Sequence, residues 1–172
     1  MGPEKPKAVM RSFLRAGVLA LLVALPASYG IYNIFRPEQY PIKFLRGDVI
    51  QVNDTLLFGP YPTEQEIKRL KRQGVTELIS LMDSSMPFES PLIGMGKRLA
   101  EENDLSFKNV SLSYLPNLKS KSNLSRVNEL VLYLRENSHK KKYVHCYLGR
   151  HRTTLVKEQY LQAIHEDQKD HN

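Results

Sequence analysis

One stretch near the N-terminus limits the possible folds of this 172-residue chain more than any other part. Residues 16–35 (AGVLALLVALPASYGIYNIF) contain no charged side chain. A helix needs about 20 consecutive apolar residues to cross the hydrocarbon core of a bilayer. We therefore expect residues 16–35 to form a single transmembrane helix, in which Pro26 is a tolerated kink.

The flanks of this stretch leave other interpretations open. A basic N-terminal region, an apolar core and small residues at Ala27 and Ser28 also fit a cleaved signal peptide, but the apolar run continues to Phe35. A buried helix of a soluble protein is the third interpretation. Basic residues are slightly more frequent before the stretch than after it. This difference weakly favours a cytoplasmic N-terminus, with the rest of the chain after the stretch on the other side of the membrane.

The distribution of charge argues against a nucleic-acid partner. The formal net charge is +7, but seven of the 25 Lys and Arg residues and only two of the 18 Asp and Glu residues lie in residues 1–46. The rest of the chain is therefore nearly neutral, whereas nucleic-acid binders usually carry their charge on the folded body. The single cysteine excludes an internal disulfide framework and a multi-cysteine metal site. We expect neither a metal nor another cofactor.

The part of the chain after the tether, which we term the body, is predicted to form one α/β domain. We assign residues 1–15 to a basic segment, 16–35 to the membrane helix, 36–46 to a tether and 47–172 to the domain. A strand pair in 48–58 is followed by helical patterns after Thr63 and in 92–103, 124–137 and 152–165, which alternate with strands in 75–81, 105–112 and 143–146. This order predicts a central, mostly parallel sheet flanked by helices.

Ligands of such sheets bind at the carboxyl ends of the strands, where we expect loops 82–91, 113–123 and 146–152 to meet. The third loop lies within HCYLGRHRT, residues 145–153, with Cys146 at a strand end and Arg152 at a helix start. A curled loop and a helix N-terminus offer backbone N–H groups to an anion, and Gly149 permits the unusual backbone angles required. Arg152 can hold two phosphate oxygens with its planar guanidinium.

A thiol in such a positive field loses its proton easily. The sequence therefore predicts in-line attack of the Cys146 thiolate on phosphorus, a phosphocysteine intermediate and its hydrolysis by water. Thr153 can donate a hydrogen bond to the departing sulfur. We expect the loop to bind the phosphate through Tyr147, Leu148, Gly149, Arg150, His151 and Arg152.

His145, Cys146, Arg152 and Thr153 match the signature H-C-x5-R-S/T of the cysteine-based protein tyrosine phosphatase superfamily, which the chain resembles from about Asp48 onward. The loop is most similar to that of small atypical dual-specificity phosphatases of plants and fungi, several of which act on inositol pyrophosphates. The resemblance implies their fold and activity. Two departures are a second threonine, where the family usually has glycine, and the early end of the chain, which implies that further helices are missing or reduced.

Three residues around this signature have less certain roles. We expect His145 to support the loop through hydrogen bonds rather than to act as a base. Arg150 and His151 are either charges at the mouth of the pocket for acidic substrates or solvated surface residues.

The general acid of the resembled family has no clear counterpart. The family often uses an aspartate in the loop after the preceding strand, but here that loop has no carboxylate and carries Asn117. Asp83, at the end of another strand on the same sheet edge, is the best substitute, and Glu89 is the second. The alternative for Asp83 is a turn residue. Without an acid, aryl phosphates or phosphoanhydrides should be favoured over alkyl phosphates.

Together these observations predict a single-pass membrane enzyme, a cysteine-dependent phosphatase of phosphotyrosine or other phosphoprotein monoesters. Two alternatives remain open at this stage. One is the same chemistry on a phosphoinositide, phospholipid or inositol (pyro)phosphate, which the membrane segment favours by proximity only. The other is a catalytically weak, phosphate-binding pseudophosphatase, which the absent acid suggests.

Overall fold

The computed structural model describes residues 6–36, 38–39, 41–113 and 117–170. The chain separates into two compact units, Met1–Ile42 and Lys43–Asn172. Residues 1–5 of the basic segment, 37 and 40 of the tether, and 114–116 of the polar loop lie outside the described residues. The second unit begins within the expected tether, and it includes Arg46 and Gly47, which are hydrogen-bonded to the rest of that unit.

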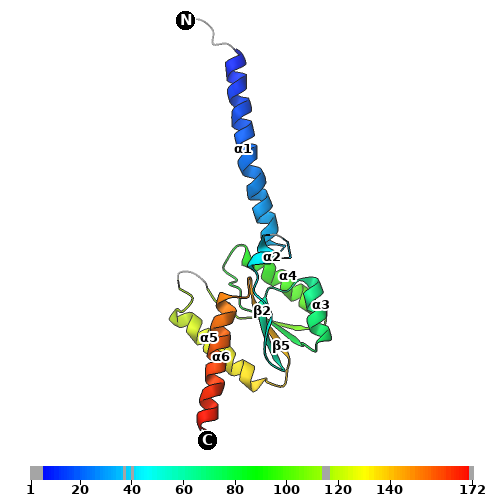
Figure 1. Ribbon diagram of the computed structural model, residues 1–172, viewed down its shortest axis with the longest axis vertical. Coiled ribbons are helices and arrows are strands. Elements are labelled where there is room, and N and C mark those ends of the chain that lie inside the picture. The colour runs from blue at the N-terminus through cyan, green and yellow to red at the C-terminus, as the bar shows by residue number, and fades with distance from the viewer. Residues whose placement is uncertain (1–5, 37, 40, 114–116, 171–172) are drawn as a thin grey trace. The chain divides into compact units, whose positions relative to one another are not determined.

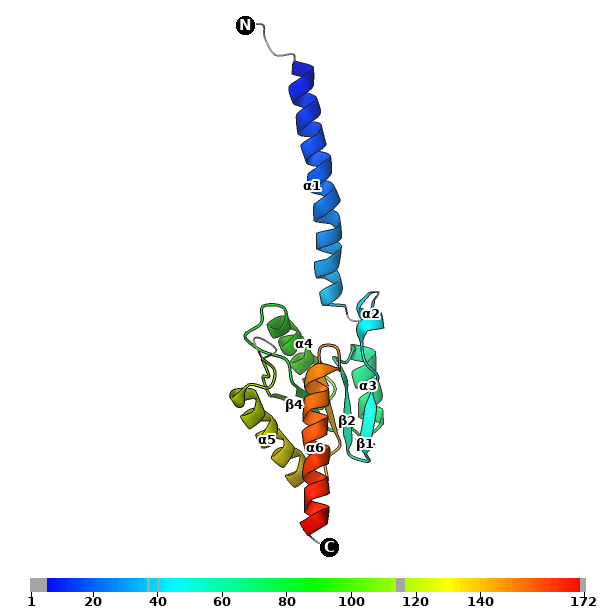
Figure 2. The same cartoon turned by 60° about the vertical axis from the view of Figure 1, so that its left-hand side comes forward.

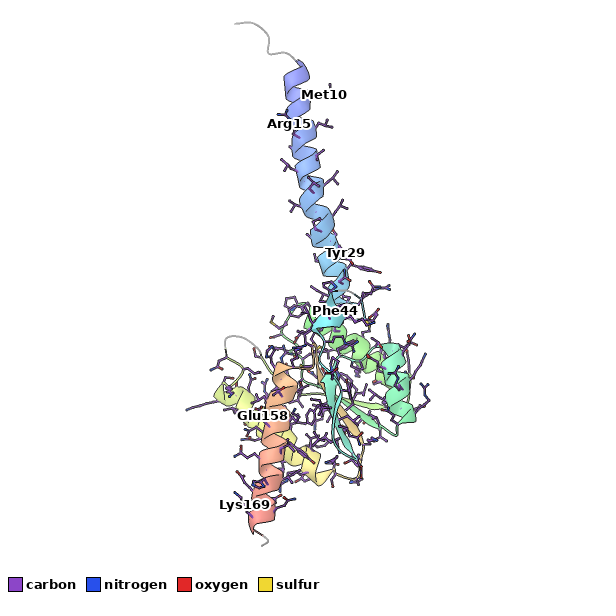
Figure 3. All side chains as sticks on the ribbon, viewed as in Figure 1. Met10, Arg15, Tyr29, Phe44, Glu158 and Lys169 are labelled. Carbon is purple, nitrogen blue, oxygen red and sulfur yellow. The ribbon has the colours of Figure 1, made fainter. Side chains whose placement is uncertain are left out.

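The first unit contains one long helix, α1 (Pro6–Ile34), with Pro26 inside it. Its stretch Phe13–Ile34 is 22 residues long, has a mean hydropathy of 1.7 and is long and apolar enough to cross a membrane. Figure 3 shows the side chains of Arg15 and Tyr29 projecting outward from this helix. Length and apolarity therefore agree with a single membrane span, although signal sequences share both properties.

The second unit is built on a five-stranded sheet with strand order β1-β2-β5-β3-β4. The strands are β1 (Ile50–Asn53), β2 (Leu56–Pro60), β3 (Glu77–Ser80), β4 (Ser106–Asn109) and β5 (Lys142–Cys146). Only β1 and β2 pair in the antiparallel sense, as a hairpin, and all other pairs are parallel. The predicted mostly parallel α/β sheet is thus confirmed, with β5 and its terminal Cys146 at the centre.

Helices cover both faces of the sheet, as Figures 1 and 2 show. On one face lie α3 (Glu64–Arg72) and α4 (Glu89–Glu101), and on the other lie α5 (Lys121–Glu136) and α6 (His151–Asp170); the short α2 (Ile42–Leu45) precedes β1. Alternate strand residues supply the two cores, because successive side chains of a strand point to opposite faces. Leu57, Leu78 and Tyr143 belong to the cluster with α3 and α4, and Phe58 and Val144 to the cluster with α5 and α6.

Local signals place most helix boundaries to within about two residues, and three differ by more: the starts of α4 and α5 and the end of α6. The helix α5 begins at Lys121 rather than at Leu124. The capping box of Thr63 and Glu66 opens α3 as predicted. However, α4 begins at Glu89 rather than at Leu92. Pro91 lies in the first turn of α4, where a helix needs no N–H donor, so this proline is compatible with helix rather than loop. The last helix extends to Asp170.

Candidate active site

Cys146 lies at the point where β5 leaves the sheet, and α6 begins only five positions later at His151. Its side chain is buried, with 5% of the residue exposed. The connecting loop requires Gly149 for two reasons. This residue has φ +70°, and an added Cβ would lie 2.3 Å from the backbone nitrogen of Pro60. The predicted need for glycine is therefore confirmed, and the close contact with β2 adds a second cause.

The carbonyl groups of the loop accept hydrogen bonds from residues outside it. The Tyr61 N–H donates to the Tyr147 oxygen (3.1 Å), and the Gly47 N–H donates to the Leu148 oxygen (2.7 Å). In a trans peptide the C=O and the following N–H point in opposite directions. The N–H groups of Leu148 and Gly149 therefore point to the opposite side of the loop, where they can face an anion.

Arg152 is held by the carboxylate of Glu89, the first residue of α4. Its Nη1 and Nη2 donate to the two carboxylate oxygens of Glu89 at 2.9 and 2.8 Å, and Nη1 also donates to the Leu81 oxygen (3.2 Å). Arg152 is 7% exposed and Glu89 is 2% exposed. A guanidinium has five N–H donors, so this pairing fixes its orientation and leaves donors for a phosphate.

Glu89 therefore has a role that the sequence reasoning missed. Its Oε2 also accepts a hydrogen bond from the Asp83 N–H (2.6 Å). Both oxygens of this carboxylate are therefore occupied by donors of the protein, two of them from the Arg152 guanidinium. The geometry indicates that Glu89 positions Arg152, which argues against its use as the second candidate for the general acid.

A pocket of about 280 Å³ opens above Cys146. It brings together most of the predicted binding residues and two residues at the start of α4. The lining residues are Phe88, Glu89, Cys146, Tyr147, Leu148, His151 and Arg152. Gly149 and Arg150 instead line a larger groove of about 620 Å³, together with Asp48 and Lys119 among others. His151 lines both. The signature loop thus separates a small pocket from a wider, more polar groove.

Thr153 lies within reach of the sulfur, as predicted. Its Oγ1 is 4.0 Å from the Cys146 Sγ and 3.3 Å from the Arg150 carbonyl oxygen, to which it donates. Rotation of the hydroxyl would move its proton from that carbonyl toward the sulfur. The position is compatible with the expected hydrogen bond to a departing thiolate.

His145 differs from expectation in how it supports the loop. The ring is 1% exposed, and neither nitrogen has a hydrogen-bond partner in the described part of the structure. It instead lies edge-on to Tyr61 (5.6 Å between ring centroids) and stacks on Tyr143 (6.0 Å). Burial lowers the pKa of His145 to about 3, so the ring is neutral near pH 7. The predicted hydrogen bonds are replaced by aromatic packing.

Asp83 is held by serine side chains. Its Oδ1 accepts from the Ser85 N–H (3.0 Å), the Ser85 hydroxyl (2.8 Å) and the Ser111 hydroxyl (3.1 Å). Burial alone would raise the pKa of Asp83, but hydrogen bonds from Ser85, Ser113 and Ser111 outweigh it and hold that pKa below its usual value. Among the described residues, the pocket lining includes Glu89 but not Asp83. These features favour the turn-residue alternative over the general acid.

Asp83→Asn is therefore expected to change kcat/KM on p-nitrophenyl phosphate and on an alkyl phosphate by the same small factor, under about threefold. Loss of a true general acid would cost about 100-fold or more on the alkyl ester. The variant should instead lower the free energy of unfolding by about 1–2 kcal/mol, because a charged acceptor is lost. Steady-state kinetics and urea unfolding check both effects, with Asp54→Asn as the control. A loss confined to the alkyl ester would restore Asp83 as the acid.

Asn117 is also away from the pocket. Its Oδ1 accepts from the Lys119 N–H (2.9 Å), so the side chain stabilises a turn of its own loop. Leu118 and Lys119, which follow it, line the larger groove.

Comparison with known proteins relates this architecture to phosphatases. No protein-family model matches the chain, and no curated protein sequence matches it. Solved structures do match. A DUF442 protein of Shewanella putrefaciens CN-32, described as a phosphatase, is 20% identical with a TM-score of 0.56, over 71% of this chain and 73% of that one.

Two further structures agree. The PTP-2 phosphatase of Cydia pomonella is 19% identical, with a TM-score of 0.54 over 69% of this chain and 71% of that one. PTPMT1 is 18% identical, with a TM-score of 0.53 over 69% and 74%. The body of this chain therefore shares its α/β fold with these solved phosphatases.

Proposed function

We propose that this chain is a cysteine-dependent phosphatase that hydrolyses phosphate monoesters through a phosphocysteine intermediate. One observation carries the proposal: Cys146 and Arg152 line the same pocket, and Glu89 fixes the Arg152 guanidinium there. A phosphate in this pocket would meet a nucleophile, a forked cation and loop N–H groups together.

The reaction would proceed in two displacements. The Cys146 thiolate attacks phosphorus, and an S–P bond forms as the bond to the ester oxygen breaks. The departing oxygen leaves as an anion or takes a proton from water. Water then attacks phosphorus, the S–P bond breaks, and inorganic phosphate and the thiolate are released. Thr153 would stabilise the sulfur as its negative charge returns.

The pocket walls favour an aromatic phosphate ester. Phe88, Tyr147 and Leu148 supply apolar surface beside Cys146. An aromatic ring packs well against such surface, whereas the hydroxyls of an inositol ring would lose water without gaining partners. An aryl oxide is also a good leaving group, which suits a pocket whose one described carboxylate, Glu89, is paired with Arg152. We therefore assign phosphotyrosine in proteins as the substrate, ahead of phosphoinositides or inositol phosphates.

We further propose that α1 anchors the enzyme as a single-pass membrane protein. The support is the length and apolarity of Phe13–Ile34 and the basic residues before it. Such an anchor would restrict the enzyme to phosphoproteins at the same membrane.

A substrate panel tests the proposed function. The full-length chain in detergent is assayed on p-nitrophenyl phosphate, on one peptide phosphorylated at tyrosine or at serine, and on phosphoinositide vesicles. We expect turnover of p-nitrophenyl phosphate and of the phosphotyrosine peptide. On the phosphoserine peptide kcat/KM should be at least about tenfold lower, because its alkyl leaving group needs a proton. Preference for the vesicles would indicate lipid phosphate. Vanadate binding without turnover of any substrate would indicate a pseudophosphatase.

A further inference from the structure

Residues 45–47, which we term the strap, lie against the outside of the signature loop. The Gly47 N–H donates to the Leu148 oxygen (2.7 Å), and the Arg150 Nε donates to the Leu45 oxygen (2.9 Å). The strap thus bonds to the loop on both sides of Gly149. These contacts belong to no step of the proposed reaction.

The strap and the loop approach too closely for any side chain at Gly47. An added Cβ would lie 2.9 Å from the Gly149 oxygen and 3.4 Å from the Leu148 oxygen. Real Cβ atoms essentially never come within 3.0 Å of another atom, so even alanine would push the two backbones apart. The short N–H···O contact at this position therefore depends on glycine.

Arg46 fastens the strap to the folded body. Its Nη2 donates to the Tyr61 oxygen (3.0 Å) and to the Glu66 Oε2 (2.7 Å), and its side chain is 11% exposed. Glu66 also forms the capping box of α3, so the strap is bonded to a helix that is itself well ordered by local hydrogen bonds. Tyr61, on the other side of Arg46, donates its own N–H to the Tyr147 oxygen.

These contacts together determine how two loop peptides are oriented. Gly47 holds the Leu148 carbonyl outward, which turns the Gly149 N–H to the other side of the loop. Tyr61, whose carbonyl accepts a hydrogen bond from Arg46, does the same for the Tyr147 carbonyl and hence for the Leu148 N–H. We propose that the strap is a positioning element of the anion site, which aims two backbone donors at the bound phosphate and at the Cys146 thiolate.

The proposal rests on the proposed function and extends it. It makes Arg46 and Gly47 positioning residues, although neither lines the pocket above Cys146. It also means that the segment leading from α1 into the body shapes the anion site. Substitutions there should weaken anion binding without removing any group that would touch substrate.

Two variants of the full-length chain in detergent test the proposal. Gly47→Ala separates the strap from the loop, and Arg46→Ala removes the side chain that joins the strap to Tyr61 and Glu66. Each should raise the dissociation constant for vanadate about tenfold, as expected when well-aimed hydrogen bonds to an anion are lost. Each should also slow alkylation of Cys146 by iodoacetamide at pH 6 about 3- to 10-fold, because the thiolate loses stabilising donors. Calorimetry and mass spectrometry measure the two effects.

The matched controls are Gly94→Ala, where an added Cβ meets nothing within 4 Å, and Lys43→Ala, which removes an exposed charge beside the strap. Both should behave like wild type. Arg46→Lys should recover much of the affinity, because one ammonium can donate to both Tyr61 and Glu66 as Nη2 does. This rescue also distinguishes positioning from a general loss of folding, which thermal unfolding monitors separately.

Folded Gly47→Ala and Arg46→Ala proteins with wild-type vanadate affinity and alkylation rates would overturn the strap proposal. If the wild type binds vanadate and alkylates rapidly but turns over no ester, the proposed function fails while the strap remains testable by both readouts. A wild type that neither binds vanadate nor alkylates faster at pH 6 than a small-molecule thiol would overturn both, since no anion site would then exist.

Discussion

Cys146→Ser is expected to reduce kcat on p-nitrophenyl phosphate on the order of 10⁴-fold or more, because a serine hydroxyl stays protonated where a thiolate would attack. The same variant should bind vanadate within about threefold of wild type through hydrogen bonds alone, since Arg152 and the loop N–H groups are unchanged. Stopped assays and calorimetry on the full-length chain measure the two quantities.

Retention of vanadate affinity is the internal control for this experiment, because it reports that the loop is still folded. Cys146 is the single cysteine of the chain, so no other thiol can replace it. Hydrolysis by the serine variant at near the wild-type rate would exclude the thiolate mechanism. Loss of both turnover and vanadate binding would point to a collapsed loop rather than to a lost nucleophile.

Arg152→Lys is the second large effect that we expect. A lysine carries the same charge but cannot form the forked pair with Glu89 and at the same time reach two phosphate oxygens. Loss of such preorganised donors costs about 10²- to 10³-fold in kcat, and we expect a fall of that size in kcat on p-nitrophenyl phosphate. Vanadate affinity should fall as well, which separates this variant from Cys146→Ser.

Arg98→Lys is a suitable control for Arg152→Lys, because Arg98 is exposed on α4 and faces Glu102 at 3.7 Å. An exposed pair of this kind contributes little, so its kinetics should match wild type. Wild-type rates for Arg152→Lys would show that charge alone is enough at this position. They would also remove the role inferred for Glu89, whose contacts with the fork hold the guanidinium in place.

The fold could be predicted from patterns that depend on neighbouring residues. Alternating and helical spacing of apolar residues located β1 to β5 and α3 to α6, because periods of 2 and 3.6 reflect one-sided burial. The short α2 was not predicted, since its residues lie in the expected tether. Thr63 and Glu66 marked the start of α3, since a capping box closes within a single turn. Gly149 and the Cys146 loop followed in the same way, from the turn that the signature requires.

The roles of several site residues could not be predicted, because they depend on which loops meet at the sheet edge. Asp83 follows a strand at the expected edge of the sheet, but Ser85 and Ser111 hold its carboxylate and it does not line the pocket. His145 was expected to form hydrogen bonds, but Tyr61 and Tyr143 enclose its ring. Each environment is completed by a side chain from a distant segment, Ser111 for Asp83 and Tyr61 for His145, which no local pattern brings there.

The sequence by itself therefore determined the α/β class, the apolar N-terminal segment and the loop that joins Cys146 to Arg152, because these follow from residue spacing within short stretches and from the order of those stretches along the chain. Only the tertiary structure decided that Glu89 holds Arg152 and that Gly47 holds the Leu148 carbonyl. Those contacts join segments far apart in the chain. Glu89 meets Arg152 because parallel β3 and β5 bring their carboxyl ends to one edge of the sheet, and Gly47 reaches the same edge because β1 runs antiparallel to β2. Local spacing contains no information about such pairs, so their geometry emerges only when the sheet is assembled.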